Sequence, residues 1–325
     1  MTNEAREFRE QPGLFSKLDA GSYKLMSPKL YFEAGRNYVR YGPGYSGSMI
    51  LSDNSPAFDM LHFRKDISFG KMIGKILIDQ FIASFNDFGA RRYLVGRRYE
   101  KTLSSQWNLA VNETAKTSKE PNPLILILPN YLYQEIIFND DDETFNSLYS
   151  LDVTYTTRKK EQAYLEFAAD HIAMPNIFGG DRFDTPRKIG YLLGVYLPDP
   201  LKTGITSLRA EYVFVDPGTY ERMHEALPNL AYTRKGLVMG HPVGSNGTAL
   251  FLRGEHWLNK KTQAIVEYFD RSPRDSGSPN ALDFKRLDAY IAYDIRPWAS
   301  LSARYIRLKD AGTENTIMLG ASISY

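Results

Sequence analysis

Residues 315–325 (NTIMLGASISY) alternate large apolar side chains with small or polar ones and end on an aromatic residue. Successive side chains of a β-strand point to opposite faces of the sheet. One face would carry Ile317, Leu319, Ala321, Ile323 and Tyr325, and the other Met318, Gly320, Ser322 and Ser324. A single apolar face is typical of a strand in an antiparallel transmembrane β-barrel of the outer-membrane type, so this all-β fold is the prediction.

Composition narrows the class of protein. A chain of 325 residues fits two soluble domains or one barrel of medium size. Its 22 Tyr and 18 Phe against 3 Trp suit the aromatic girdles of a barrel, although a Tyr-rich β-sandwich would show the same excess. A mean hydropathy of −0.39, with no apolar run approaching the length of a membrane helix, excludes a helical span. Interspersed charges summing to +2 argue against a nucleic-acid surface.

The absence of cysteine excludes disulfides, thiolate metal sites and cysteine nucleophiles. At the amino terminus, residues 1–10 (MTNEAREFRE) are charged, and no apolar stretch of a signal peptide follows them. An outer-membrane protein needs such a signal. We therefore expect an incomplete product or a gene model that starts too late, with a partly irregular segment over residues 1–28 and a barrel domain over 29–325. The alternative is that the protein is not in a membrane.

About 14 strands are predicted, each bounded by clusters of Gly, Pro, Asn and Asp. Most have roughly the length that crosses a bilayer at a tilt. Their expected ranges are 29–41, 60–69, 71–84, 91–99, 103–113, 146–157, 161–170, 187–197, 204–214, 247–258, 262–270, 284–295, 298–308 and 315–325.

The predicted connections alternate between short and long. Short ones lie at Gly70, near Lys101, and at 158–160, 198–203, 259–261 and 296–297. The other class holds every long connection, at 42–59, 114–145, 171–186, 216–246 and 271–283, together with the shorter 86–90 and 309–314. A soluble sandwich gives no reason for this asymmetry, whereas outer-membrane barrels have short periplasmic turns and long outer loops. The long connections 114–145 and 216–246 either extend outwards or fold inward as plugs.

Charged residues in the middle of strands share the face opposite the apolar row. A basic residue facing lipid at the midplane would cost about 2–4 kcal/mol, so these side chains should face a wet lumen. Because both signs are present, we expect them to pair and to make a cross-linked, partly closed interior. The residues concerned are Asp152, Glu166, Arg209, Glu211, Arg253, Glu255, Asp288 and Arg304.

Several motifs fit ordinary structural roles better than chemistry. Residues 42–47 (GPGYSG) match G-x-G-x-x-G, but the segment after them is poor helix material, so a tight, glycine-bent loop is expected instead of a nucleotide site. The acidic run 139–143 lacks the spacing of a calcium loop, and the five His residues lack zinc-site spacing. We expect no metal and no cofactor.

No catalytic set can be assembled from the sequence either. There is no G-x-S-x-G elbow. Glu211 and Glu255 resemble a glycosidase pair only superficially, because each has an arginine two residues away on its own face. Structural ion pairs are the better interpretation. The sequence therefore argues against an enzyme.

Four segments of the chain are distinctive: 33–56 (EAGRNYVRYGPGYSGSMILSDNSP), 164–170 (YLEFAAD), 208–216 (LRAEYVFVD) and 235–247 (KGLVMGHPVGSNG). Together they resemble the capsule-assembly Wzi family. The PG-x-SGS-x-x-LS-x-N and GH-x-x-x-x-N runs are the specific part, since strand formation does not require them. The resemblance implies an outer-membrane barrel of 18 strands preceded by a periplasmic helical bundle. It also implies a surface lectin that holds capsular or exported polysaccharide and assists capsule assembly.

The count of about 14 strands is roughly four short of that barrel. No helical bundle is visible in the sequence, which fits a chain lacking its amino-terminal portion. Closure of the barrel is then in question, because an open sheet edge in lipid leaves backbone groups unpaired. Expected partners are capsular or exported polysaccharide, outer-membrane lipid and export-machinery proteins, but not nucleic acid.

Sugar rings present apolar faces and hydroxyl edges, so a binding site needs aromatic platforms and planar polar groups. Lumenal arginines could bind acidic sugars by forked hydrogen bonds. For every candidate the alternative role is loop packing or lumen bracing. Candidate polysaccharide-binding residues are Tyr41, Tyr45, Asp53, Asn54, Tyr131, Tyr133, Arg209, Glu211, His241, Asn246, Arg253 and Glu255. The alternative functions are a general diffusion porin and a soluble β-rich lectin or hydrolase.

Overall fold

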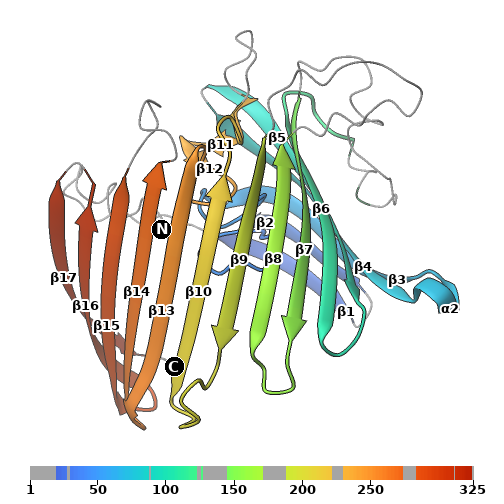
Figure 1. Ribbon diagram of the computed structural model, residues 1–325. Helices are drawn as coiled ribbons and strands as arrows, with labels where there is room; N and C mark the ends of the chain where they lie inside the picture. The colour runs from blue at the N-terminus through green and yellow to red at the C-terminus, as the bar shows by residue number, and fades with distance from the viewer. Residues whose placement is uncertain are drawn as a thin grey trace.

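The computed structural model describes residues 20–27, 30–87, 89–122, 126, 145–170, 188–221, 230–273, 283–310 and 312–323. One antiparallel sheet of 15 strands dominates it, and each strand pairs with the next large strand along the chain. Figure 1 shows this sheet curving around an interior. The strands are β1 (Gly21–Ser27), β2 (Leu30–Asn37), β3 (Phe58–Ser68), β4 (Lys75–Asp87), β5 (Ala90–Thr102), β6 (Trp107–Thr117), β7 (Phe145–Thr156), β8 (Gln162–Asp170), β9 (Ile189–Leu197), β10 (Thr206–Val215), β13 (Gly247–Asn259), β14 (Thr262–Pro273), β15 (Phe284–Arg296), β16 (Ala299–Lys309) and β17 (Thr313–Ile323).

Two small elements complete the described part. A two-stranded hairpin is formed by β11 (Thr233–Arg234) and β12 (Leu237–Val238), and the four-residue helix α2 (Gly70–Ile73) connects β3 to β4. Within the described ranges, no helix combines the length and apolar character needed to cross a bilayer.

The predicted antiparallel all-β fold is confirmed, with differences at a few boundaries. β1 lies in the segment expected to be partly irregular, and it pairs with β2. β2 ends at Asn37, before the predicted residue 41, because the chain there turns into the interior, where Tyr41 makes a single bridge to Leu51. β6 begins at Trp107 and not at 103, because a backbone hydrogen bond from Leu103 to Trp107 closes a turn over the intervening residues.

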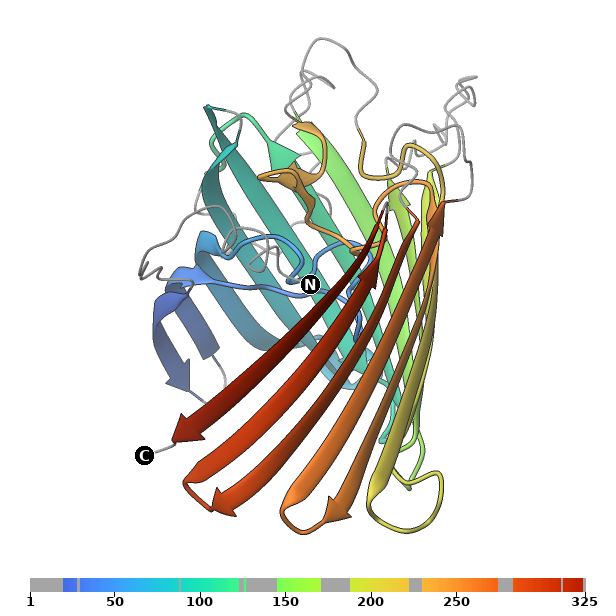
Figure 2. The same ribbon diagram turned by 90° about the vertical axis from the view of Figure 1, so that its left-hand side faces the viewer.

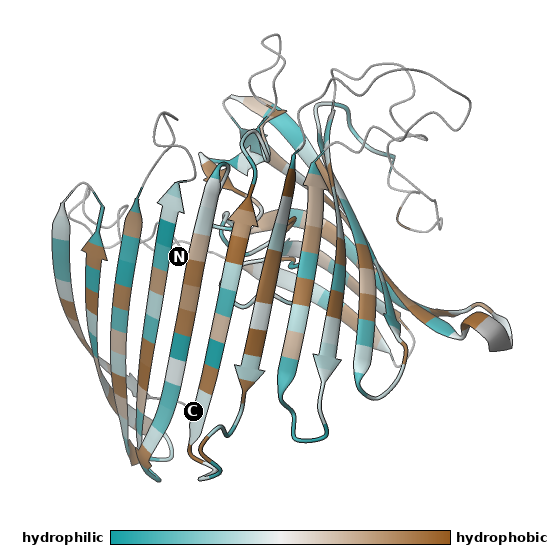
Figure 3. Ribbon diagram, viewed as in Figure 1, coloured by the Kyte–Doolittle hydropathy of each residue, from teal (hydrophilic) through white to brown (hydrophobic). Residues whose placement is uncertain are grey.

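The outer and inner faces of the sheet follow the predicted alternation, and Figure 3 shows it as bands along the strands. Inward residues include the buried Glu166, Glu211 and Asp288. Large apolar side chains of the opposite rows are exposed on the outside: Leu151, Leu165, Phe167, Leu193, Val195, Leu208, Tyr212, Leu250, Leu252, Val266, Ile291, Tyr293, Leu301, Ile317 and Leu319. The paired charges expected in the interior are present, for example between Arg98 and Asp152 at 2.6 Å.

The two edge strands of the sheet do not pair with each other. Among the described residues, β1 pairs only with β2, and β17 pairs only with β16. Figure 2 shows β1 and β17 well apart on the side that faces the viewer. The sheet therefore has the curvature of a barrel, with a seam between β1 and β17 that the described strands leave open.

The hydrophobic core lies inside the curve of the sheet, where two connections fold inward. We call them together the plug: the described residues 38–57, between β2 and β3, and 216–221 with 230–246, between β10 and β13. Figure 2 shows both pieces within the curve. The core combines plug residues with wall residues, and its members include Tyr41, Met49, Ile50, Leu51, Tyr220, Tyr232, Met239 and Val243 from the plug and Leu148, Ala168, Leu192, Val213, Val215 and Ala249 from the wall.

Hydrogen bonds join the two pieces of the plug. The Ser52 amide donates to the Met239 carbonyl at 2.8 Å, and the Asn54 side-chain amide donates to the Val238 carbonyl at 2.8 Å. The Tyr220 hydroxyl donates to the Met49 carbonyl at 2.5 Å. Buried backbone groups need such partners, so the two connections satisfy each other in the interior.

A buried lysine fixes the plug to the wall. Lys116 Nζ on β6 lies 2.6 Å from Asp87 on β4, and both side chains are almost completely buried. The same ammonium donates to the carbonyls of Ala231 and Thr233, at 2.9 and 2.8 Å. All three protons of the ammonium are therefore used where water has no access.

Candidate functional site

The tip of the plug, residues 42–48, is bent by glycine and held by an arginine. Gly42 has φ +130°, and a Cβ there would lie 2.3 Å from the Glu166 carboxylate, so only glycine fits. Arg40 reaches across the loop, with Nε 3.1 Å from Ser48 Oγ and NH2 bonded to the carbonyls of Gly44 and Tyr45. The glycine-bent loop predicted from the GPGYSG motif is confirmed.

Glu211 on β10 holds this tip against the wall. Its carboxylate accepts hydrogen bonds from the amides of Tyr45 at 2.5 Å and Ser46 at 2.7 Å. It also accepts from the hydroxyls of Ser46 and Tyr164, each at 2.5 Å. Four donors satisfy the oxygens of a carboxylate. Glu211 therefore positions the loop and has little capacity left for a ligand.

His241 supports the same tip from behind. Its Nδ1 accepts from the Val243 amide at 3.1 Å, so the proton of the neutral ring is assigned to Nε2, 3.2 Å from Ser46 Oγ. Complete burial, with a smaller contribution from Arg40, lowers the pKa of His241 to about 3. The neutral ring can donate to Ser46, whose hydroxyl donates on to Glu211.

Tyr45 presents its ring at the end of the tip. The ring stacks on Phe251 with centroids 5.6 Å apart, and 41% of the residue is exposed. The guanidinium of Arg209 lies 4.7 Å from the ring centroid, and that of Arg253 lies 5.2 Å from it. The tip of the plug thus forms an accessible surface of aromatic and cationic groups.

Arg209 and Arg253 differ in their partners. Arg253 forms ion pairs with Glu255, at 2.7 Å, and with Glu267. The Arg209 guanidinium also lies 4.4 Å from the ring centroid of Tyr196 and donates to the Tyr164 hydroxyl at 3.0 Å. Within the described part of the chain, it forms no ion pair with a carboxylate.

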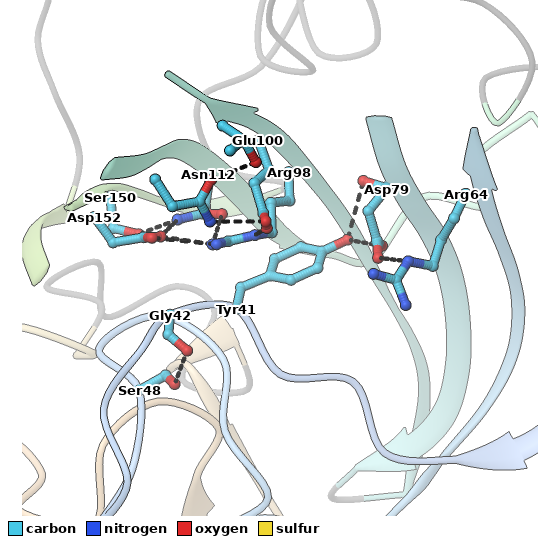
Figure 4. Close-up of polar contacts among 12 residues, drawn as sticks. Tyr41, Gly42, Ser48, Arg64, Asp79, Arg98, Glu100, Asn112, Ser150 and Asp152 are labelled. Carbon is cyan, nitrogen blue, oxygen red and sulfur yellow. Dashed lines mark hydrogen bonds and ion pairs between the residues drawn. The ribbon is translucent and has the colours of Figure 1, made fainter. Parts of the chain in front are cut away.

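A polar pocket of about 350 Å³ lies beside the plug on the opposite wall, which β2 to β5 form. Figure 4 shows Tyr41 pointing between Asp79 and the pair of Arg98 with Asp152. Residues at the pocket bond to one another: Arg64 Nε lies 2.8 Å from the Asp79 carboxylate, and the Tyr41 hydroxyl lies 2.9 Å from it. The lining is Tyr31, Glu33, Asn37, Tyr38, Val39, Arg40, Gly42, His62, Arg64, Asp79, Arg98 and Glu100.

The structure brings six of the predicted site residues together at the tip of the plug: Tyr45, Arg209, Glu211, His241, Arg253 and Glu255. Tyr41 is 1% exposed, so its ring has no free face for a sugar. Asn54 and Asn246 are inside the plug, where the Asn246 amide donates to the Asp216 carbonyl at 3.3 Å. Asp53 is exposed, 3.7 Å from Arg40. Tyr131 and Tyr133 lie outside the described residues.

Sequence reasoning missed the residues that complete the cluster. Tyr196 and Phe251 are cross-strand partners of Arg209 and Glu211, so the sheet register alone places them in the site. Glu267 is likewise the cross-strand partner of Arg253, with which it forms an ion pair. Knowing the register would have revealed all three. Ser46 gives no such signal, because only the inward path of the loop brings it to Glu211.

No metal site accompanies the cluster. In the part of the chain that the structure describes, no group of three or more His, Asp or Glu side chains is arranged to hold a metal ion. What the site offers a ligand is a ring face, two guanidinium groups and hydrogen-bonding edges.

The fold and its apolar, exposed outer rows define this protein as an outer-membrane β-barrel protein. A family model for the capsule assembly protein Wzi matches residues 15–314, which is most of the chain. The protein belongs to this family. In sequence, no curated protein matches the chain.

Solved structures show the same fold. Wzi of Escherichia coli, an outer-membrane protein involved in group 1 capsule assembly and described as a carbohydrate-binding β-barrel, superimposes with a TM-score of 0.66. Identity is 13%, and the match covers 92% of this chain and 68% of that one. OccK5 (OpdH) of Pseudomonas aeruginosa superimposes with a TM-score of 0.51 at 9% sequence identity, and the match covers 94% of this chain and 81% of that one. OccK11 (OpdR) of the same organism superimposes with a TM-score of 0.50 at 11% identity, and the match covers 93% of this chain and 79% of that one.

Proposed function

We propose that this protein binds surface polysaccharide at the tip of its plug and thereby assists capsule assembly without catalysing a reaction. Membership of the Wzi family supports the role in capsule assembly. The description of the E. coli protein as carbohydrate-binding supports the type of ligand. Contacts with export-machinery proteins stay a prediction.

The observation that carries the proposal is the tip of the plug with its ring face beside two guanidinium groups. Tyr45 is held in place by Glu211 and Phe251 and still exposes 41% of its surface. A fixed aromatic ring loses little conformational entropy on binding, so it is a good platform for the apolar face of a sugar. The polar pocket on the opposite wall supplies further hydroxyl, amide and carboxylate groups for sugar hydroxyls.

The plug argues against a general diffusion porin. Side chains from both connections fill the interior next to Leu192, Val213 and Val215, all of which are fully buried or nearly so. A porin needs a water-filled channel at that level. We therefore expect no porin-sized conductance steps in a planar bilayer.

The two carboxylates that resemble a glycosidase pair have other partners. Glu211 accepts four hydrogen bonds from the plug and Tyr164, and Glu255 pairs with Arg253 at 2.7 Å. A general acid or base needs a carboxyl group that reaches the substrate. A binding role therefore suits these residues better than hydrolysis.

The test is retention of purified capsular polysaccharide by the protein folded in detergent. We expect Tyr45→Ala and Arg253→Ala to weaken retention, because each removes one component of the surface at the tip. Tyr212→Ala is the matched control, since Tyr212 is an exposed tyrosine on the outer face of β10. Equal retention by all four proteins would refute this location for the site, and no retention by the wild type would refute the function.

A further inference from the structure

Arg209 differs in its partners from three other inward-facing arginines of this sheet. Arg98, Arg253 and Arg304 each pair with a carboxylate, at 2.6 Å or slightly more. Arg209 has no carboxylate partner among the described residues, although its charge is permanent. Its guanidinium carbon lies 4.4 Å from the Tyr196 ring centroid and 4.7 Å from that of Tyr45.

This arrangement prepares Arg209 for an anion. Contacts with the Tyr45 and Tyr196 rings, together with the hydrogen bond to the Tyr164 hydroxyl, hold the plane of the guanidinium in position. The remaining N–H groups lie at the edge of that plane, the direction from which a carboxylate binds in a forked pair. The neighbouring rings can contact the body of the sugar that carries the carboxylate.

The order of residues along the strands gives the direction from which a ligand arrives. On β10, from the long connection towards the short turn, Val215 and Val213 pack in the core, Glu211 holds the tip, and Arg209 follows. On β13, read in the same direction, Ala249 packs in the core, and Phe251 and Arg253 then meet Tyr45.

The cluster therefore lies on the short-turn side of the plug. Short turns of outer-membrane barrels are periplasmic. We propose that Arg209 is the receptor for a sugar carboxylate of an acidic polysaccharide, and that this receptor is filled from the periplasmic side of the plug. The inference rests on the proposed polysaccharide binding and adds the ligand's charge and its direction of entry.

The first experiment compares two forms of one probe on the detergent-folded protein. The probe is capsular polysaccharide from the host strain, either native or with its carboxyl groups chemically reduced to alcohols. We expect reduction to weaken binding to the wild type about tenfold, the loss typical of one charge-assisted hydrogen-bonded contact. Arg209→Gln should bind the native form about tenfold more weakly and should no longer distinguish the two forms.

Two further variants keep this experiment decisive. Arg304→Gln removes an inward arginine that is already paired with Asp288, and it should bind like the wild type. Arg209→Lys keeps the charge but not the planar fork, so its affinity for the native probe should lie between those of the wild type and Arg209→Gln. A heat-dependent shift in gel mobility checks that each variant is folded.

The outcomes separate the two proposals. If both forms of the probe bind the wild type equally, the carboxylate receptor is wrong and polysaccharide binding stands. If Arg209→Gln still prefers the native form as the wild type does, the receptor is not Arg209. If neither form binds the wild type, the proposed function itself fails.

The second experiment tests the direction of entry. The sequence has no native cysteine, so each variant below carries a single thiol. Gln263→Cys places a thiol on the short-turn side, at a residue that bonds Glu255 at 3.4 Å. Asp310→Cys places one in the connection between β16 and β17, on the other side. A membrane-impermeant maleimide added to intact cells should label only Asp310→Cys. In permeabilised cells it should label both, and polysaccharide should protect Gln263→Cys; labelling of Gln263→Cys in intact cells would overturn the periplasmic direction.

Discussion

The wall that faces the plug and the wall that does not are built from the same alternating strands, yet they bury their charges very differently. On β6, Lys116 is completely buried, and its ammonium joins a carboxylate and two plug carbonyls. On β16, the inward Arg304 pairs with the buried Asp288 at 2.6 Å, and 41% of the Arg304 side chain is exposed. The difference shows that the plug removes an inward cation from water, whereas the sheet alone leaves one partly exposed.

Removing the charge of Lys116 from the wall that faces the plug should lower the free energy of unfolding the most. Lys116→Met would leave the buried Asp87 with the Lys235 amide, at 3.1 Å, as its remaining donor among the described residues, and two carbonyls without the ammonium. Breaking a buried ion pair by removing one partner typically costs about 3–5 kcal/mol. Denaturant unfolding of the lipid-reconstituted protein should show this loss. A change below the error of the fit would mean that the plug does not seal this position.

A smaller effect is expected where the two pieces of the plug meet. Tyr220→Phe removes the hydroxyl that donates to the Met49 carbonyl at 2.5 Å and accepts from the His241 amide at 3.4 Å. Leaving buried polar groups unsatisfied costs about 1–3 kcal/mol. The same unfolding measurement applies, with Tyr212→Phe on the outer face as the control. Equal stabilities of the two variants would contradict the buried junction.

The plug should also make stability depend on pH. His241 has a pKa of about 3 in the folded protein, below its ordinary value of 6.5, because burial disfavours the charged ring. Between these values the unfolded chain binds more protons at this position, so His241 lowers the free energy of unfolding as the pH drops below about 6.5. The slope from this group alone reaches about 1.4 kcal/mol per pH unit. Between pH 7 and 5 the stability of the wild type should fall more steeply than that of His241→Gln, and the difference between the two slopes should approach this value towards pH 5.

The smallest effect belongs to the outer face of the sheet. Lys285→Met removes an exposed ion pair with Asp270, whose attraction solvent largely screens. We expect no resolvable change in the unfolding midpoint. A loss comparable with that of Lys116→Met would mean that burial under the plug is not what makes the Lys116 ion pair costly to break.

The direction of the side chains in the walls could be predicted from sequence, because it depends only on the alternation along each strand. Arg209 and Glu211 occupy alternate positions between apolar neighbours, and that period alone directs them inward. The plug could not be predicted in the same way. The contact between Ser46 and Glu211 joins residues 165 positions apart, and that between Ser46 and His241 joins residues 195 apart. No local period encodes such pairs, although the two motifs that carry the family resemblance, PG-x-SGS-x-x-LS-x-N and GH-x-x-x-x-N, lie one in each piece of the plug.

Amide hydrogen exchange over residues 41–52 of the folded, unliganded protein tests the inward position of the plug most directly. The Tyr41 amide bonds the Leu51 carbonyl at 3.0 Å, the Ser52 amide bonds Met239, and those of Tyr45 and Ser46 bond Glu211. We predict protection of this segment comparable with that of β10. Exchange as fast as that of an exposed surface loop would show that these residues lie outside the lumen, and the site assembled around Tyr45 would then not exist.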